Sequence, residues 1–575
     1  MRVRRIRWTV SGFLARSLST NLEVIRLVCE DGAKHELRWP AYAASTLVVL
    51  CFSYFAGRKG LYLFDFGVNT KMGWLILNGW RPHVDFTTPI PPLCGLLSAL
   101  AFRLFGVSYM ATVVLASLTS ATAFLLIANN LRRLPIPSTL SLLFSFVFVL
   151  PTLPAAGVFF YNHLAMLLTV LLSSYCIRRI AVRQERCNHA VEIAMWGLAG
   201  LLLLTKLQYG IAYIILLVLL AICAPEKRQW PTLKEIRTTV ARTVLPCALP
   251  CLVVLAWEGF PMAAVSRDLL HTVSSSFFMS SIKQNAATSL GWIDSIIAQP
   301  QFTVSFFVLL VITAGAAARS KYAEGIPRRW HIWVFSALSL GVLVLLSGTT
   351  AEAPAMFVSV YAVVLLCITL LTRDAERVDR LSAANWLIVP MLLHLLWFSV
   401  QYDYRAARKC WIEGPTPGFD IRRGRDDWCE ARIPFFAGLR IRSGQKPILE
   451  SIYALQQTLS DRTFFFGEEF GMMYPATGRM PPRGWPLWFH PGVSMTRETA
   501  LLLPADFEQY HYDFVVVSHN RYYLNGFLDD ALRKHYTKVP LDNTRSWVDV
   551  YSRSDNPELM AAARRVLAAN GGDAL

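Results

Sequence analysis

Apolar residues recur along the first two thirds of the chain in stretches of about 16 to 21 residues, the length of helix that crosses a lipid hydrocarbon core. Short polar loops separate these stretches, so each is predicted to be a membrane-spanning helix. They lie at 41–56, 108–128, 138–154, 160–177, 191–205, 210–224, 243–257, 302–318, 331–347, 355–372 and 385–401. The pattern therefore predicts an all-α polytopic membrane domain of about 11 transmembrane helices over residues 41–401.

The stretch 91–105 is apolar but short, and it carries Arg103. Whether it crosses the membrane decides on which side of the membrane every later loop lies. We interpret it as an interfacial or re-entrant helix, because about 15 residues are too few for a full span. Clusters of Lys and Arg then all fall on the side of the N-terminus. They are Arg132/Arg133, Arg178 to Arg186, Lys227 to Arg242, Arg319 to Arg329 and Arg373 to Arg380. The positive-inside rule places this side, with the basic segment 1–40, in the cytoplasm.

Composition agrees with a membrane protein, since 54% of the residues are hydrophobic and only 17% are charged. The mean hydropathy of +0.39 is too high for a soluble chain of this length. The net charge of +17 lies mostly in short loops between apolar stretches, where basic residues set topology. We therefore expect membrane lipids, and no nucleic acid, among the partners.

With this topology, four segments lie outside the cytoplasm: the first loop 57–106, a turn near Asn162, the loop 258–301 and the region 402–575. The last region is predicted to be a small extracytoplasmic α/β domain. Its predicted strands and helices are Thr463 to Phe466, Phe514 to Val517, 445–458 and 525–536. The domain either covers the site as a lid or acceptor surface, or only packs on the membrane part.

Cysteines fall mostly inside the apolar stretches, where they act as small apolar residues. Cys410 and Cys429 differ, because they flank a polar stretch after the last predicted span. An extracytoplasmic setting permits a disulfide between them, and two free thiols are the alternative.

The first loop carries two carboxylates, Asp65 and Asp85, on either side of a predicted short amphipathic helix. Carboxylates at the membrane surface can abstract a proton from an acceptor or hold a divalent cation such as Mg²⁺ or Mn²⁺. Structural roles are the alternative: Asp65 can cap the helix that follows from Val68, and Asp85 can stabilise the turn before Pro89.

A set of short motifs in this loop occurs in a fixed order. They are Asp65, Gly79, Pro82, Asp85-Phe86, Pro91-Pro92-Leu93 and Phe105-Gly106. In this order they resemble the first extracytoplasmic loop of the GT-C glycosyltransferases. The most similar branch contains protein O-mannosyltransferases and bacterial transferases that modify lipid A or polysaccharide. The resemblance covers residues 40–210.

The resemblance implies an inverting transfer of a hexose or pentose from a polyprenyl-phosphate donor to a glycolipid, polysaccharide or protein. It places the family's catalytic acid on Asp65, as general base or acceptor-orienting group, and a phosphate-binding cation on Lys206. It also implies the inner membrane of a bacterium. The sequence departs from the family at Phe66, where many members have a second acid, and at Asn162, where relatives often have Asp.

Other polar residues on the same side are candidates for contacts with donor or acceptor. They are Arg81, His83, Lys71, Asn162 and Tyr209. Lys206 has a second interpretation as a lysine that marks the membrane boundary. The loop 258–301 contains Arg267, Asp268, His271 and Lys283, which we interpret as a solvated or headgroup-facing helix surface.

A transporter or flippase is the rival class, and a non-catalytic assembly partner is a third. Transporters place ionisable residues or broken helices near the middle of the bilayer. The predicted spans hold almost none, His394 being the main exception, and no spacing of His, Cys and acids indicates zinc. The acids lie in the loops instead, which favours an enzyme that acts at the membrane surface.

Overall fold

A computed structural model describes the chain from residue 39 to residue 571, with gaps. The described residues are 39–58, 61, 65–134, 138–149, 159, 161–181, 189–223, 233–274, 428–443, 445–467, 470–487, 489, 497–518, 528–540 and 548–571. Four of the predicted spans, 302–318, 331–347, 355–372 and 385–401, lie outside these residues. The predicted total of about 11 transmembrane helices therefore stays a prediction.

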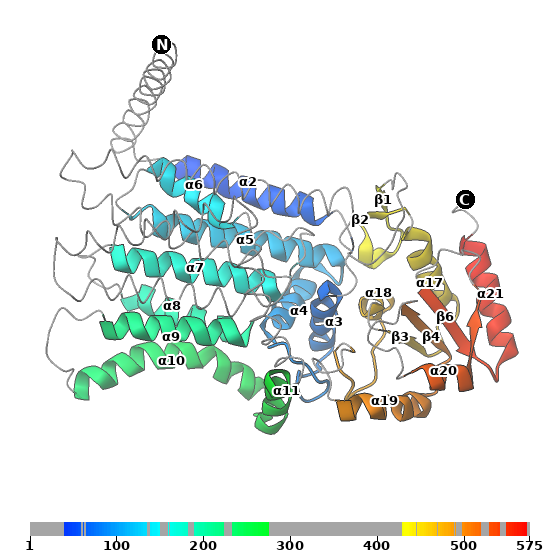
Figure 1. The fold of residues 1–575 in the computed structure, drawn as a ribbon. Coiled ribbons are helices and arrows are strands. Elements are labelled where there is room, and N and C mark those ends of the chain that lie inside the picture. The colour runs from blue at the N-terminus through cyan, green and yellow to red at the C-terminus, as the bar shows by residue number, and fades with distance from the viewer. Residues whose placement is uncertain are drawn as a thin grey trace, which may run out of the picture.

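Seven described helices correspond to predicted spans, and they lie side by side with their axes roughly aligned (Figure 1). They are α2 (Trp39–Gly57), α5 (Tyr109–Leu131), α6 (Ser138–Val149), α7 (Tyr161–Ala181), α8 (His189–Leu203), α9 (Leu207–Cys223) and α10 (Leu233–Glu258). Within the described part, three helical segments are long and apolar enough to cross a membrane: Trp39–Gly57, Tyr109–Leu131 and Ala241–Glu258. Each of these seven predicted spans overlaps its helix, so the apolar pattern located these seven elements correctly.

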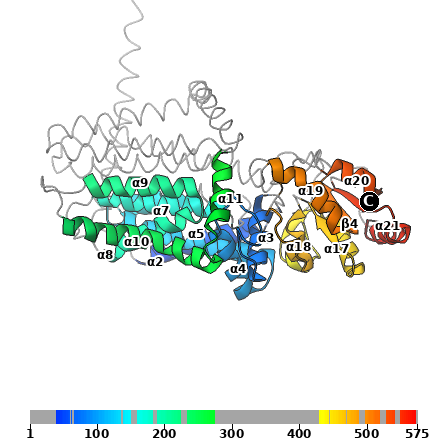
Figure 2. The same cartoon turned by 90° about the horizontal axis from the view of Figure 1, so that it is seen from below.

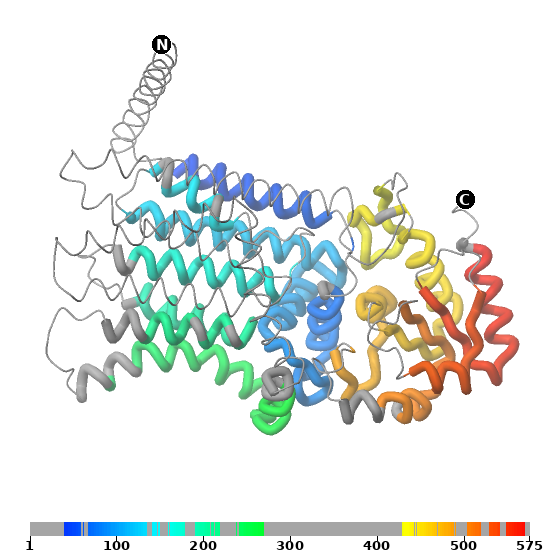
Figure 3. Tube along the Cα trace, in the orientation of Figure 1, coloured from blue at the N-terminus to red at the C-terminus, as the bar shows by residue number. Residues whose placement is uncertain are grey.

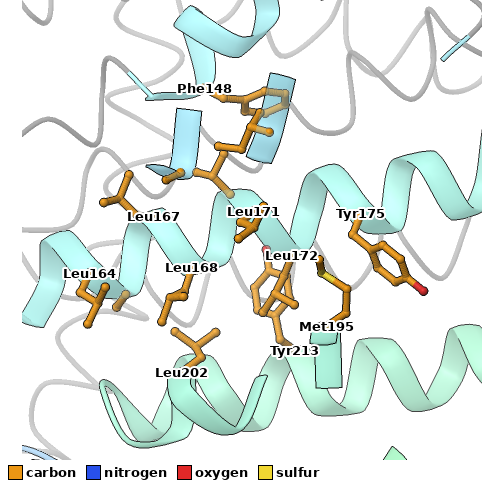
Figure 4. Packing of buried hydrophobic residues seen from close by; sticks show 14 of the residues in the cluster. Phe148, Leu164, Leu167, Leu168, Leu171, Leu172, Tyr175, Met195, Leu202 and Tyr213 are labelled. Atoms are coloured by element: carbon orange, nitrogen blue, oxygen red, sulfur yellow. The ribbon is translucent and has the colours of Figure 1, made fainter. Parts of the chain in front are cut away.

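Helix α7 lies in the middle of this bundle, and its leucines fill the space between α5, α6, α8 and α9. Figure 4 shows Leu168, Leu171 and Leu172 pointing towards Leu202 and Tyr213. Hydrogen bonds also join the helices. Ser173 and Tyr213 hydroxyls are 2.6 Å apart, and Asn130 Nδ2 donates to Ser174 Oγ at 3.0 Å, while Arg178 Nη1 donates to Asn130 Oδ1 at 3.3 Å. Such bonds satisfy polar groups that cannot reach water.

The contact between α8 and α10 is so close that only glycine fits at position 200. A Cβ on Gly200 would lie 2.1 Å from the carbonyl oxygen of Cys247 in α10. On Gly197, one turn earlier in α8, a Cβ would meet nothing nearer than the Pro246 carbonyl oxygen at 3.8 Å. Gly200 therefore sets the distance between these two helices.

The first loop folds into two helices, α3 (Asp65–Leu77) and α4 (Leu93–Phe105), which pack against each other. With 13 residues, α4 is shorter than the helices long enough to cross a membrane. Both helices lie between the membrane bundle and the C-terminal part of the chain (Figure 3). The segment 91–105 is thus a short helix at one end of the bundle, as the charge pattern indicated.

The C-terminal part contains a four-stranded sheet with the strand order β3-β4-β6-β5, covered by helices. Its described elements are β1 (Trp428–Glu430), η5 (Pro434–Phe436), β2 (Arg440–Arg442), α17 (Lys446–Thr458), β3 (Phe464–Phe466), α18 (Met473–Thr477), α19 (Arg497–Tyr510), β4 (Phe514–Ser518), α20 (Asp529–His535), β5 (Tyr536–Val539), β6 (Val548–Arg553) and α21 (Pro557–Gly571). β3 and β4 are parallel and fully buried, and the other pairings are antiparallel. The predicted small α/β domain is present, and Figure 2 shows it beyond one end of the bundle.

Cys429 lies in β1, whereas Cys410 is outside the described residues. The disulfide between them therefore stays a prediction.

Candidate functional site

Lys206 lies in the connection between α8 and α9, at the end of the bundle that faces the first loop. Its Nζ donates to Oδ1 of Asn162 at 3.0 Å. The same Nζ lies 4.9 Å from the ring centroid of Tyr209 and 5.9 Å from that of Tyr161. Three of the predicted site residues, Lys206, Asn162 and Tyr209, are therefore neighbours, although they come from two separate parts of the sequence.

The amine of Lys206 is largely withdrawn from water. Burial lowers its pKa from the usual 10.5 to about 7, because the surroundings solvate the ammonium ion less well than water does. An anion beside this amine would favour the charged form and raise the pKa again. The electrostatics suit a residue that becomes fully charged when it binds an anionic group.

Backbone contacts join this group to the first loop. The N–H of Leu93, the first residue of α4, donates to the carbonyl oxygen of Leu204 at 3.1 Å. Tyr161 packs against the apolar cluster of the loop that contains Trp80 and Phe86. Since α4 also packs on α3, the helix that begins at Asp65 and the hairpin that carries Lys206 belong to one connected structure.

Asp65 is the first residue of α3, so the helix begins three residues before the predicted Val68. The structure describes the backbone of Asp65 but not its side chain. Both alternatives for Asp65, helix capping and chemistry, therefore stay open.

Asp85 belongs to a tight turn and is held by it. Its Oδ2 accepts the backbone N–H of Arg81 at 2.8 Å, and its Oδ1 lies 3.7 Å from Nη1 of Arg483 in the C-terminal domain. Its own carbonyl oxygen accepts the N–H of Gly484 at 2.7 Å. The carboxylate thus holds the turn between Arg81 and Asp85 and lies beside Arg483 of the C-terminal domain. Its predicted part in the chemistry stays a prediction.

His83 is buried in the same turn, with a left-handed backbone at φ 62°. Its Nδ1 lies 2.9 Å from Oδ2 of Asp268, and that oxygen also accepts the N–H of Thr88 at 3.3 Å. Asp268 belongs to α11 (Met262–Ser274), which follows α10. The interpretation of this helix surface as solvated is wrong for Asp268, which is buried because the first loop folds over it.

Arg81 reaches the end of α10, where its Nη1 lies 3.4 Å from the carbonyl oxygen of Glu258. Glu258 is itself buried, and sequence reasoning missed both it and Asp268 as site residues. The overlooked signal was an acid directly after the predicted span 243–257, followed by the Gly259-Phe260-Pro261 turn. An ionisable residue at the end of a membrane helix is a functional candidate by default.

Lys71 lies apart from the residues around Lys206 and from the turn that holds His83 and Asp85. It contacts the C-terminal domain. Its Nζ donates to the carbonyl oxygen of Leu487 at 2.9 Å and lies 5.1 Å from the ring centroid of Tyr474 and 5.9 Å from that of Phe489. Burial lowers its pKa to about 7. The structure places this predicted ligand-binding residue in a contact between the first loop and the domain.

Within the described parts of the chain, no group of three or more His, Cys, Asp or Glu side chains could hold a metal ion. A divalent cation at Asp65 stays a prediction.

No family model matches the chain, and no curated protein matches it. Among solved structures, ArnT from Cupriavidus metallidurans is similar, both in the apo state (13% identity, TM-score 0.48) and bound to undecaprenyl phosphate (14%, 0.46). Each alignment covers 89% of this chain and 97% of that one. The oligosaccharyltransferase of Archaeoglobus fulgidus in its apo form is similar at 11% identity and a TM-score of 0.46, over 91% of this chain and 78% of that one.

One of these similar structures is named an oligosaccharyltransferase, which is a glycosyltransferase, the class that the first loop resembles. TM-scores below 0.5 carry neither a residue's role nor an activity over to this chain.

Proposed function

We propose that this protein is an integral membrane glycosyltransferase that moves a sugar from a polyprenyl-phosphate donor to an extracytoplasmic acceptor, which is a glycolipid, a polysaccharide or a protein. The observation that carries the proposal is Lys206, an amine withdrawn from water at the end of a membrane helical hairpin and fixed by Asn162 and Tyr209. Cationic side chains bind phosphate through charge-assisted hydrogen bonds, and Lys206 supplies such a cation at the end of the hairpin.

The helix next to Lys206 offers a surface for the lipid part of such a donor. Ile211, Ile215 and Val218 of α9 are exposed, and their spacing places them on one face of the helix. This apolar face begins five residues after Lys206. A polyprenyl chain lying along it would bring its phosphate to the amine.

In the proposed reaction, the acceptor oxygen forms a bond to the anomeric carbon of the donor sugar. The bond between that carbon and the phosphate oxygen breaks, and polyprenyl phosphate leaves with the electron pair. The proton of the acceptor hydroxyl passes to the carboxylate of Asp65. Lys206 stabilises the charge that develops on the leaving phosphate.

The remaining predicted residues take supporting roles in this proposal. Asp85 fixes the turn that presents Arg81 and His83, and Arg81 contacts the donor or acceptor with its half-exposed guanidinium group. We further propose a multi-pass protein in the inner membrane of a bacterium, with the basic loops in the cytoplasm and the first loop, Lys206 and the C-terminal domain on the opposite side.

The test uses purified full-length protein in lipid nanodiscs, with undecaprenyl phosphate as the binding probe. Lys206→Ala should weaken binding of this lipid about 10-fold or more, as expected when a charged hydrogen bond is lost. Lys534→Ala in α20, whose side chain is 69% exposed, is the matched control and should bind normally.

Transfer is measured with a lipid extract rich in polyprenyl-phosphate sugars. Asp65→Asn should bind undecaprenyl phosphate like the wild type but transfer no sugar. Equal binding by the wild type and Lys206→Ala, or normal transfer by Asp65→Asn, would remove that residue from the mechanism. Binding by the wild type without any sugar transfer would favour the flippase alternative.

A further inference from the structure

Glu258, the last residue of α10, has a buried carboxylate oxygen that lacks a hydrogen-bond partner. Only 2% of the residue is exposed, and its Oε1 has no partner among the residues that the structure describes. A buried polar atom without a partner costs about 1–3 kcal/mol, and more when the group is charged. Almost all buried polar groups in folded proteins have a hydrogen-bond partner, so an unpartnered buried oxygen is a candidate for ligand binding.

The surroundings of this carboxylate are built from two other elements. Nη1 of Arg81 lies 3.4 Å from the carbonyl oxygen of Glu258, and His83 belongs to the same turn of the first loop as Arg81. The His83 ring is fixed, because Asp268 holds its Nδ1 at 2.9 Å. The polar side chains around the unpartnered oxygen are therefore anchored before any ligand arrives.

The same cluster reaches the surface on its outer side. The side chains of Arg81 and Arg267 are 44% and 57% exposed. Phe260, in the turn between α10 and α11, is also exposed and has a left-handed backbone. Its neighbour Gly259 lies against Nη1 of Arg81, so an exposed aromatic residue borders the polar cluster in the chain. Sites for small polar molecules combine apolar residues with a few polar groups in this way.

We propose that Glu258, with His83 and Asp268, forms a subsite for a neutral or amino sugar, whose hydroxyl or ammonium hydrogens donate to the free carboxylate oxygen. The subsite rests on the proposed function, in which it binds the sugar ring of the donor or of the acceptor, while Lys206 binds phosphate. Next to the unpartnered oxygen, Glu258 and Asp268 would repel the carboxylate of a uronic acid, whereas Arg81 and Arg267 lie on the outer side of the cluster. Acidic sugars should therefore bind more weakly than neutral ones.

The experiment measures binding of methyl glycosides to the full chain in nanodiscs by saturation-transfer NMR. The panel contains methyl glucoside, methyl mannoside, methyl glucosaminide and methyl glucuronide. Glu258→Gln keeps the size of the side chain and removes its charge. It should weaken binding of the neutral or amino glycosides about 10-fold, the loss typical of a hydrogen bond to a charged group. Glu558→Gln, at an exposed position in α21, is the control and should bind normally.

Undecaprenyl phosphate separates this inference from the proposed function. Glu258→Gln should bind that lipid normally, which also shows that the variant is folded, and Lys206→Ala should keep its glycoside binding. A glycoside that binds together with undecaprenyl phosphate and stays bound when an undecaprenyl-phosphate sugar is added occupies the acceptor position. One that this lipid-linked sugar displaces occupies the donor position.

Equal glycoside binding by Glu258→Gln and the wild type would overturn the subsite, as would binding of methyl glucuronide as tight as that of the neutral glycosides. Loss of both glycoside and undecaprenyl phosphate binding in Glu258→Gln would also overturn it, because the residue would then support the whole fold. If undecaprenyl phosphate binds to no variant and not to the wild type, the proposed function fails, whereas glycoside binding that depends on Glu258 would still identify a sugar site.

Discussion

Lys71 permits a quantitative test of how the C-terminal domain is held on the first loop. The residue is 4% exposed, and its amine has Leu487 O at 2.9 Å and two aromatic rings around it. Replacing it in Lys71→Met keeps most of the apolar volume and removes the ionisable group. The Leu487 carbonyl loses its donor, at a cost of about 1–3 kcal/mol.

The pKa of Lys71 sets the size and the sign of the effect. Burial lowers this pKa from 10.5 to about 7, so between these values the unfolded chain binds more protons than the folded chain. The free energy of unfolding then rises with pH, by at most about 1.4 kcal/mol per pH unit and about 5 kcal/mol across the whole window. Below about pH 7 both states are protonated, and the cost of burying the charge is fully present.

The assay is thermal unfolding in nanodiscs, followed by tryptophan fluorescence between pH 6.5 and 9.5. We expect the midpoint of the wild type to rise with pH relative to that of Lys71→Met. The variant should be the more stable of the two at pH 6.5 and lose this advantage at pH 9.5. Lys534→Met, at a side chain that is 69% exposed, should follow the wild type. Parallel pH profiles for the wild type and Lys71→Met would refute the argument, because the buried amine would then not be the group that titrates.

Three further experiments test other parts of the structure. Gly200→Ala should lower the thermal midpoint by several degrees, since its Cβ would lie 2.1 Å from the Cys247 carbonyl oxygen, whereas Gly197→Ala should leave it unchanged; equal midpoints would contradict the close helix contact. Asp85→Asn should keep sugar transfer within about threefold, because its amide oxygen still accepts the Arg81 N–H; a loss as complete as that expected for Asp65→Asn would assign Asp85 to the chemistry. Binding of undecaprenyl phosphate should weaken between pH 7 and 9 in the wild type, because Lys206 loses its proton above about pH 7, and a binding titration that stays flat would contradict this role.

The sequence could predict those parts of the fold that depend on apolar periodicity. The spans that became α2, α5 and α7, and the buried strands at Phe464 and Phe514, follow directly from runs of apolar residues. Their positions depend mainly on how much apolar surface each segment must remove from water. The short helix at 91–105 also followed, because length and one arginine argued against a span.

Contacts between distant segments could not be predicted in this way. Lys206 and Asn162 were both selected as candidates, yet their hydrogen bond depends on how α7 and the α8–α9 hairpin pack. Asp268 was assigned to solvent because helical spacing shows which residues share a face and not which face is later covered. Lys71 contacts Leu487, which lies 416 residues further along the chain, and local pattern carries no information on such a contact.

The pairing of the first loop with residues 484–487 has a consequence for how the protein is made. Gly484 and Leu487 donate their N–H groups to the carbonyl oxygens of Asp85 and Thr87, and Thr87 donates to Trp485. The two partners are about 400 residues apart, so at synthesis rates of about 5–20 residues per second the loop waits roughly 20 to 80 s for its partner segment. During this interval the described membrane helices after the first loop, α5 to α10, are synthesised while the turn that carries Arg81 and His83 is still incomplete. Completion of this turn is thus one of the last events of biogenesis, and a ribosome that stops before residue 484 leaves the first loop without its partner segment.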